Sequence, residues 1–326
     1  MISDRISDPE SITRQLALEI LRADDSELPA LVESSRHTKA AHFGSSFQFC
    51  SIINARSGAC NADCKFCAQS SFYKTGAPVY GLVSQDDILA GARLAEEAGA
   101  VRYGIVTSGT APAWSDLLRI CEAVREIRRT LRIIPDCSIG IVNNRALSLL
   151  KEAGIDRIHH NLETSREFYP QISSVYKWDD KFDYIKRVKA HGFSLCSGGI
   201  FGMGESDEDI VSLAWSLKDV SPESIPINFL VPIEGTPLMG QGNMTPGRAL
   251  RIVILFRLLF PSSEVRLCGG RETHLLEFER TALSVADSAM VGGYLTRPQR
   301  PPAEDRRLIE DLGCALVRPG EILLPQ

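Results

Sequence analysis

The chain has 326 residues, 44% of them hydrophobic, and can bury a large core as one large barrel or as two ordinary domains. Its formal net charge of −5, with Lys and Arg scattered along the sequence, argues against a nucleic-acid partner and provides no polybasic membrane-binding segment. The first residues, MISDRISDPESITRQLALEI, contain acids and no signal-peptide core, and no uncharged run of about 18 apolar residues follows. We therefore expect a cytoplasmic protein with no membrane partner.

Short runs with the composition of strands alternate with longer helical patterns along the chain. The strand candidates lie near residues 47, 101, 132, 157, 194, 224, 264 and 288. Eight strands with intervening helices predict an α/β fold of the (β/α)8 TIM type, in which active sites lie at the carboxyl ends of the strands. We expect a helical N-terminal extension over residues 1–40, the barrel over 41–300 and a short C-terminal tail over 301–326.

Nine cysteines in a reducing compartment favour metal ligation or catalysis over disulfides. Three of them, Cys60, Cys64 and Cys67, follow the first strand in SGACNADCKFCAQS with the spacing C-x3-C-x2-C. Three thiolates can hold three irons of a 4Fe-4S cluster and leave the fourth iron open. A structural zinc site is the alternative, but it normally requires four ligands, and no fourth one lies close in the loop.

This spacing after the first strand resembles the radical S-adenosylmethionine (SAM) superfamily. The resemblance implies that the open iron binds SAM, and that one electron from the cluster cleaves SAM to methionine and a radical that abstracts hydrogen from carbon. The stretches HHNLETSREFY, CSGGIFGMGE, PINFLVPIEGTPL and VRLCGGRE resemble the biotin synthase family in order and separation. This closer resemblance implies insertion of sulfur into dethiobiotin from an auxiliary iron–sulfur cluster, a flavodoxin or ferredoxin electron donor, and a homodimer.

Four polar residues resemble the family's ligand-binding positions. The resemblance assigns Asn161 and Asn228 to the substrate, Glu163 to the ribose of SAM and Lys181 to the carboxylate of SAM. Glu163 replaces the usual aspartate, and Lys181 replaces an arginine, which keeps the charge but loses the bidentate fork. The alternative for either asparagine is a structural role, with its amide bound to backbone at the end of the barrel.

The auxiliary-cluster positions match the family only in part. Three cysteines and one arginine usually hold a 2Fe-2S cluster there. Cys137, Cys196 and Arg266 are taken as three of these ligands, but Gly104 stands at the fourth position and cannot ligate iron.

Two extra cysteines could replace the missing ligand. Because residues two apart on a strand share a face, Cys268 is expected to face the lumen with Arg266, and Cys50 on the first strand could do so too. We therefore predict that Cys50, Cys137, Cys196 and Cys268 hold a sulfur-donating four-iron cluster, with Arg266 neutralising thiolate charge. This pattern is similar to the biotin synthases called type II. A 2Fe-2S cluster is the alternative for the cluster, and ordinary burial is the alternative for Cys50 and Cys268.

The two remaining cysteines lie outside these motifs. Cys121, in an amphipathic helix, and Cys314, in the tail, are expected to be structural. A maturase or mutase of the same superfamily is one competing function, and the cluster residues argue against it. A non-catalytic iron–sulfur scaffold is the other competitor, and it would have no use for substrate-facing asparagines.

Overall fold

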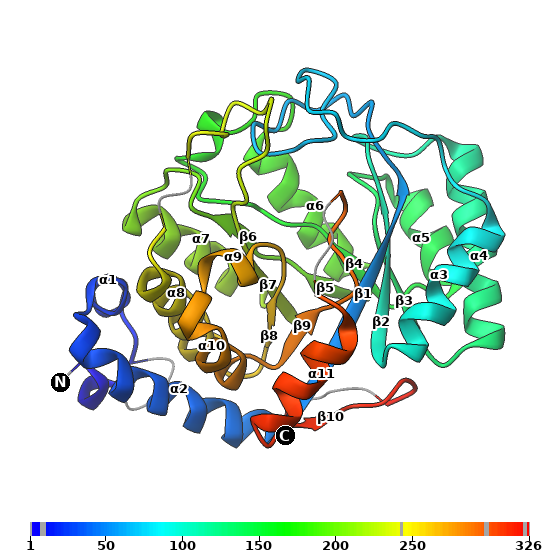
Figure 1. Cartoon of the computed structure of the whole chain (residues 1–326). Helices are drawn as coiled ribbons and strands as arrows, with labels where there is room; N and C mark the ends of the chain where they lie inside the picture. Colours follow the sequence, from blue (N-terminus) through cyan, green and yellow to red (C-terminus); the bar gives the residue numbers. More distant parts are fainter. Residues whose placement is uncertain (1, 7–10, 242–243, 297–299, 322–324, 326) are drawn as a thin grey trace.

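The computed structural model describes residues 2–6, 11–241, 244–296, 300–321 and 325. Its centre is a barrel of parallel strands in the order β1-β2-β3-β4-β5-β7-β8-β9, closed by the pairing of β9 with β1 (Figure 1). The strands are β1 (Ser46–Arg56), β2 (Ala100–Thr107), β3 (Ile134–Ser138), β4 (Arg157–His159), β5 (Ser194–Cys196), β6 (Gly199–Phe201), β7 (Ser224–Phe229), β8 (Glu264–Leu267), β9 (Ser288–Met290) and β10 (Ala315–Leu316). This closed barrel confirms the predicted (β/α)8 architecture.

The fifth barrel strand is interrupted, so that β5 and β6 both pair with β7. The interruption lies at Ser197 and Gly198. A Cβ atom on Gly198 would lie 2.1 Å from the carbonyl oxygen of Pro226, so only glycine allows the two backbones to approach this closely. The strand predicted near residue 194 is therefore two short strands in line.

Helices surround the barrel and connect successive strands (Figure 1). They are α1 (Arg14–Arg22), α2 (Leu28–Phe43), α3 (Gln85–Glu97), α4 (Trp114–Thr130), α5 (Asn144–Ala153), α6 (Trp178–Ala190), α7 (Asp207–Val220), α8 (Pro246–Leu259), α9 (Arg271–His274), α10 (Glu279–Val285) and α11 (Pro302–Asp311). Two of them, α3 and α7, begin with capping boxes in which Ser84 and Ser206 exchange hydrogen bonds with an aspartate three residues later. Short 3₁₀ turns cover Ser3–Arg5, Asp25–Glu27, Tyr169–Gln171 and Leu276–Phe278.

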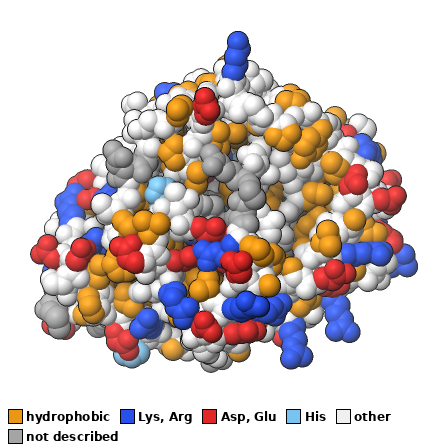
Figure 2. Space-filling view, in the orientation of Figure 1, with side chains coloured by type: hydrophobic (Ala, Val, Ile, Leu, Met, Phe, Trp, Pro, Cys, Tyr) orange, Lys and Arg blue, Asp and Glu red, His pale blue; other side chains and the backbone are white. Residues whose placement is uncertain are grey.

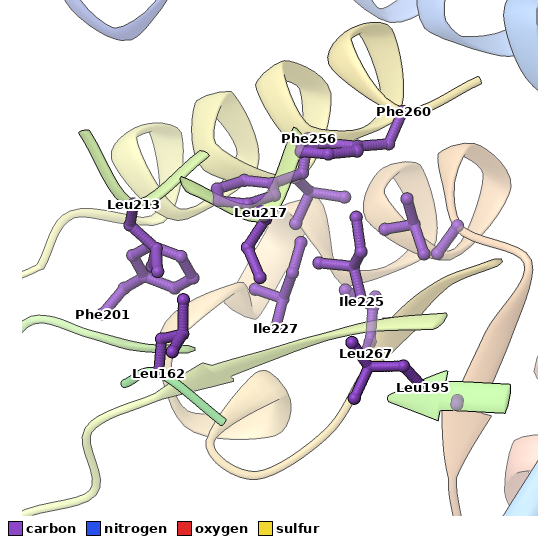
Figure 3. Packing of buried hydrophobic residues seen from close by; sticks show 14 of the residues in the cluster. Leu162, Leu195, Phe201, Leu213, Leu217, Ile225, Ile227, Phe256, Phe260 and Leu267 are labelled. Carbon is purple, nitrogen blue, oxygen red and sulfur yellow. The ribbon is translucent and has the colours of Figure 1, made fainter. Parts of the chain in front are cut away.

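The main hydrophobic core lies between the strands and the helices. Figure 3 shows outward-facing side chains of β5, β7 and β8 packed beneath those of α7 and α8, including Leu195, Ile225, Ile227, Leu267, Leu217 and Phe256. Because side chains alternate along a strand, the residues between these face the lumen. The outer face of each strand thus supplies the packing energy, and the inner face is left for a site.

The last described strand, β10, adds to the outside of the barrel beside β1, with Phe47 paired to Leu316. The tail also contacts α2, where the Lys39 ammonium lies 3.9 Å from the thiol of Cys314. These contacts hold the segment around β10 against α2 and the barrel wall.

Acidic and basic side chains are intermixed on the face shown in Figure 2 rather than separated by sign. Of the helices in the described residues, none combines the length and apolarity that a bilayer span requires.

Candidate active site

The barrel encloses a cavity of about 190 Å³ that is reached by side chains from all around the wall. The residues that border it include Cys50, Ile52, Arg102, Asp136, His159, Asn161, Glu163, Cys196, Asn228, Arg266, Cys268 and Met290. A second cavity of about 230 Å³ lies at the mouth of the barrel and is bordered by Cys67. Phe66, Asn228 and Tyr294 border both cavities, so the two are adjacent.

The loop after β1 carries Cys60, Cys64 and Cys67, each of them only partly exposed. The backbone N–H of Gly109, just beyond β2, lies 3.3 Å from the Cys60 sulfur and can donate a hydrogen bond to it. Burial raises the pKa of Cys64 to about 12 and that of Cys67 to about 11. Their thiolates therefore require compensation by a bound cation or metal centre.

Asp63 fixes the cysteine loop to the segment after β4. Its carboxylate accepts hydrogen bonds from the Ser173 hydroxyl at 2.8 Å and from the backbone N–H groups of Ser174 and Val175 at 2.9 and 3.0 Å. Burial opposes ionisation, but these hydrogen bonds hold the pKa of Asp63 well below its usual range. The same Ser173 hydroxyl lies 3.8 Å from the sulfur of Cys64. Asp63 thus orients the loop that presents the three cysteines.

Glu163 and Lys181 lie beside this loop. Lys181, on α6, is buried over the ring of Tyr176, and burial lowers its pKa although Glu163 and Cys64 oppose the change. Burial also raises the pKa of Glu163, and Lys181 counteracts this. Glu163 has a φ of 73°, and its buried Oε2 has no hydrogen-bond partner. Such an orphaned acceptor in a strained backbone fits a ligand hydroxyl.

Asn161 and Asn228 both reach the lumen cavity, and backbone groups hold both of them. The Asn161 Oδ1 accepts a hydrogen bond from the N–H of Gly198 at 3.1 Å. The Asn228 Oδ1 accepts from the N–H of Gly269 at 3.1 Å, while its Nδ2 donates to the carbonyl of Gly199 at 3.2 Å. Both asparagines therefore do bind backbone groups, as a purely structural role would require. This binding also fixes the orientation of both amides at the cavity wall.

Three thiols face the lumen around one arginine. Cys50 and Cys268 form a small buried cluster with Met290 on the inner face, and Cys196 lies 3.9 Å from the Arg266 Nη1. Burial raises the pKa of all three thiols, and Arg266 opposes this change at each of them. The structure therefore brings together Cys50, Cys196, Cys268 and Arg266, as expected from the sequence.

Arg266 is held from below by a buried acid. Its Nε and Nη2 donate to the Glu264 Oε1 at 3.0 and 2.8 Å, and Arg157 binds the other oxygen of Glu264 at 2.7 Å. With two of its nitrogens bound to Glu264, Arg266 presents only Nη1 to the thiols. This geometry agrees with a charge-neutralising role.

Known protein families match the segment that contains the cysteine loop, and individual proteins match nearly the whole chain. The model of the radical SAM superfamily matches residues 55–214, and that of the biotin and thiamin synthesis associated domain matches residues 226–315. The biotin synthase of Sulfurihydrogenibium sp. (strain YO3AOP1) is 46% identical over 319 residues, which cover 98% of this chain and 96% of that protein. The chain belongs to the biotin synthase family. The biotin synthase of Aquifex aeolicus (strain VF5) is 47% identical over 93% of this chain and 92% of its own.

Solved structures of more distant proteins share the fold. Methylornithine synthase matches with a TM-score of 0.84 at 19% identity, covering 98% of both chains. The FeFe-hydrogenase maturase HydG from Carboxydothermus hydrogenoformans matches with a TM-score of 0.83 at 16% identity, covering 97% of this chain and 79% of its own. At these identities the likeness establishes the barrel and not the reaction.

Cys137 does not face the site that the family resemblance assigned to it. Although this residue borders the lumen cavity, its side chain belongs to the outer core together with Cys121. The electrostatic neighbours of its thiol are Asp136 and Cys121, not the lumen cysteines. Asp136 instead faces inward, where Arg102 binds it at 2.8 Å. The prediction of Cys137 as a ligand was therefore wrong by one residue, since a shift of one reverses the face.

Gly104 lies on β2 level with Asp136 on β3. A Cβ atom on Gly104 would lie 3.1 Å from the Cγ2 of Ile52. A side chain at Gly104 would therefore point toward the lumen cavity but would require Ile52 to shift by a few tenths of an ångström. The thiols that border the lumen with their side chains inward come from β1, from β5 and from the residue after β8, and Gly104 offers none from β2.

Gly104→Cys is expected to destabilise the protein by about 1 kcal/mol, because the added Cβ atom would be crowded against the Cγ2 of Ile52. Thermal unfolding of the metal-free protein checks this. Adding Ile52→Ala should recover part of the loss. Equal unfolding temperatures for Gly104→Cys and the parent would show that the space is free.

His159 is a lumen residue that the sequence reasoning missed. It ends β4, and its Nδ1 lies 3.2 Å from the sulfur of Cys196. Burial lowers the pKa of His159 to about 4, so the ring is neutral at pH 7. Its position two residues before Asn161 was the available signal, because the two share a face of the strand.

Proposed function

We propose that this biotin synthase inserts sulfur into dethiobiotin by radical chemistry, with a 4Fe-4S cluster and SAM at the barrel mouth and an auxiliary cluster inside the barrel. The observation that carries the proposal is that two sets of cysteines lie at different depths of the same barrel. Cys60, Cys64 and Cys67 lie in the loop at the mouth, and Cys50, Cys196 and Cys268 line the lumen. A substrate held between the two sets would contact both.

The mouth residues fit the radical centre. The three loop cysteines would hold the 4Fe-4S cluster, which together with SAM supplies reductive cleavage to a radical that abstracts hydrogen. The adjacent mouth cavity would accommodate SAM. Lys181 provides a buried cation for a carboxylate, and the unpartnered Oε2 of Glu163 provides an acceptor for a ribose hydroxyl.

The upper lumen fits a small cyclic urea. Asn161 and Asn228 are buried and held by backbone groups, so their amides offer oriented donors and acceptors to the ureido ring of dethiobiotin. Orientation of this kind lowers the barrier by fixing the reacting carbon relative to the radical source and the sulfur source. The narrow cavity also excludes water from a reactive radical.

The lower lumen fits an auxiliary cluster of the four-iron type. The thiols of Cys50, Cys196 and Cys268 line the lumen, whereas Gly104 offers no ligand and the Cys137 side chain packs in the outer core. Arg266, anchored by Glu264, would neutralise the cluster's negative charge. A sulfur-rich cluster held in this way would be the donor of the inserted atom, and a 2Fe-2S cluster is the alternative.

The predicted partners remain proposals. A flavodoxin or ferredoxin would deliver the electron at the mouth, a homodimer is the proposed assembly, and the cytoplasm is the proposed compartment. The division of the chain at residues 40 and 300 likewise stays a prediction.

Anaerobic turnover tests the proposed function. The reconstituted protein, given SAM, a reductant and dethiobiotin, should form biotin together with one 5′-deoxyadenosine for each of the two C–H bonds broken. Sulfur-34 incorporated during cluster reconstitution should appear in the product. Cleavage of SAM without any labelled biotin would contradict the proposal.

A further inference from the structure

His159 is placed among the auxiliary-site residues but has no role in the function described above. We propose that His159 is the fourth protein ligand of the auxiliary cluster, giving that cluster three thiolates and one imidazole. This inference rests on the proposed function, since it requires a cluster in the lumen.

The position of His159 carries the inference. Its Nδ1 lies 3.2 Å from the Cys196 sulfur. Two ligands of one tetrahedral iron, with bonds of about 2.0–2.1 Å to nitrogen and about 2.3 Å to sulfur, lie about 3.5 Å apart. A small adjustment of the ring would therefore bring both atoms to the same iron.

The chemistry of the ring also fits ligation. Imidazole nitrogen is a common ligand of iron and other transition metals, and the His159 ring lies among the residues that border the lumen cavity. A ligating histidine commonly has an acid nearby that stabilises its other N–H group. Glu163, whose Oε2 has no partner, is one of the charges that act on His159.

Other polar groups around the lumen are already engaged. Asp136 is bound by Arg102, and Arg266 is bound through two nitrogens to Glu264. His159 is therefore the best-placed nitrogen donor beside the three lumen thiols in the described part of the chain. A four-iron cluster has four corners, so three cysteines leave one corner for it.

The site would differ chemically from an all-cysteine one. Replacement of a thiolate by a neutral imidazole raises the reduction potential of an iron–sulfur cluster. His159 also lies two residues below Asn161 on the same face, so the histidine corner would be the one nearest the substrate. A neutral and more labile ligand at that corner suits a cluster that gives up sulfur.

Pulsed EPR on the reduced auxiliary cluster tests the assignment. The sample is the full chain with Cys60, Cys64 and Cys67 changed to alanine, so that only the lumen cluster remains. We expect a strongly coupled nitrogen that changes when histidine is labelled with nitrogen-15. This labelling distinguishes histidine from Arg266 as the nitrogen donor.

His159→Cys is the decisive variant, because it offers a thiolate in place of the ring. It should retain iron, lose the nitrogen coupling and show a lower reduction potential. His160→Phe is the matched control, because His160 packs edge-on against Tyr184 in the outer layer and its Nε2 has no partner. The His160→Phe variant should leave the nitrogen coupling and the reduction potential unchanged.

Three results would overturn the assignment. Iron without any histidine coupling in the parent would refute ligation by His159 and leave the proposed function intact, as would a coupling that persists in His159→Cys. Absence of iron from the parent would refute both proposals. Mössbauer spectra report the same nitrogen-ligated iron in the oxidised cluster, so a cluster that resists reduction is still tested.

Discussion

Changing either Cys50 or Cys268 to alanine is expected to abolish biotin formation while cleavage of SAM continues. Each thiol lines the lumen, and the cysteine loop at the mouth is untouched by the change. Mutation of a residue that only hydrogen-bonds to a metal ligand typically lowers metal affinity or activity by about 10–100-fold. Loss of the ligand itself should therefore lower biotin formation by at least about 100-fold. Parallel assays of biotin, 5′-deoxyadenosine and bound iron check this.

Cys137→Ala is the matched control for these two variants. It removes an equally buried thiol, but one that packs beside Cys121 outside the barrel. We expect a loss of stability of about 1 kcal/mol with normal auxiliary iron and biotin formation. Loss of iron in Cys137→Ala, together with its retention in Cys50→Ala and Cys268→Ala, would show that Cys137 is a cluster ligand and that Cys50 and Cys268 are not.

Changing Cys67 to alanine should eliminate both the cleavage of SAM and the formation of biotin. This thiol borders the mouth cavity, and an open-site 4Fe-4S cluster with three protein ligands cannot lose one and keep its geometry. Cleavage of SAM should fall to the level seen without protein, and about half of the iron or less should remain in the lumen site.

Cys314→Ala serves as the control for the Cys67 variant, because Cys314 lies beside Lys39 at the outer wall of the barrel. It should retain cleavage of SAM and all bound iron. Cleavage that survives in Cys67→Ala would exclude the loop as the radical centre.

The barrel could be predicted because each strand leaves a local pattern of apolar residues bounded by helix caps and glycines. The strand at residues 194–201 is a partial exception. Its break at Gly198 is caused by the approach of Pro226 from β7, a contact between segments far apart in the sequence. Local pattern alone could not place that contact.

The loop cysteines were recognisable because all three lie within eight residues and share one function. The lumen ligands come from different strands, so they depend on which face each residue occupies. β3 is only five residues long, and nearly all of it is buried, so IPDCS has no apolar and polar alternation to fix the face of Cys137. The cross-strand pairing of Arg102 with Asp136 settles it.

The charges beneath the site were also beyond the reach of a local pattern. Glu264 joins Arg157 of β4 to Arg266 of β8, which are more than 100 residues apart. Buried charges must be paired to be tolerated, but the sequence alone does not reveal which partner each one takes. His159 was missed for the same reason, because its role is apparent only beside Cys196.

Iron and sulfide analysis with Mössbauer spectra, on the anaerobically reconstituted chain with Cys60, Cys64 and Cys67 changed to alanine, is the most direct test of the auxiliary site. A cluster held by Cys50, Cys196 and Cys268 predicts about four irons per chain. About two irons would mean that the smaller cluster persists without its usual ligand from β2. No iron at all would contradict sulfur donation from the lumen.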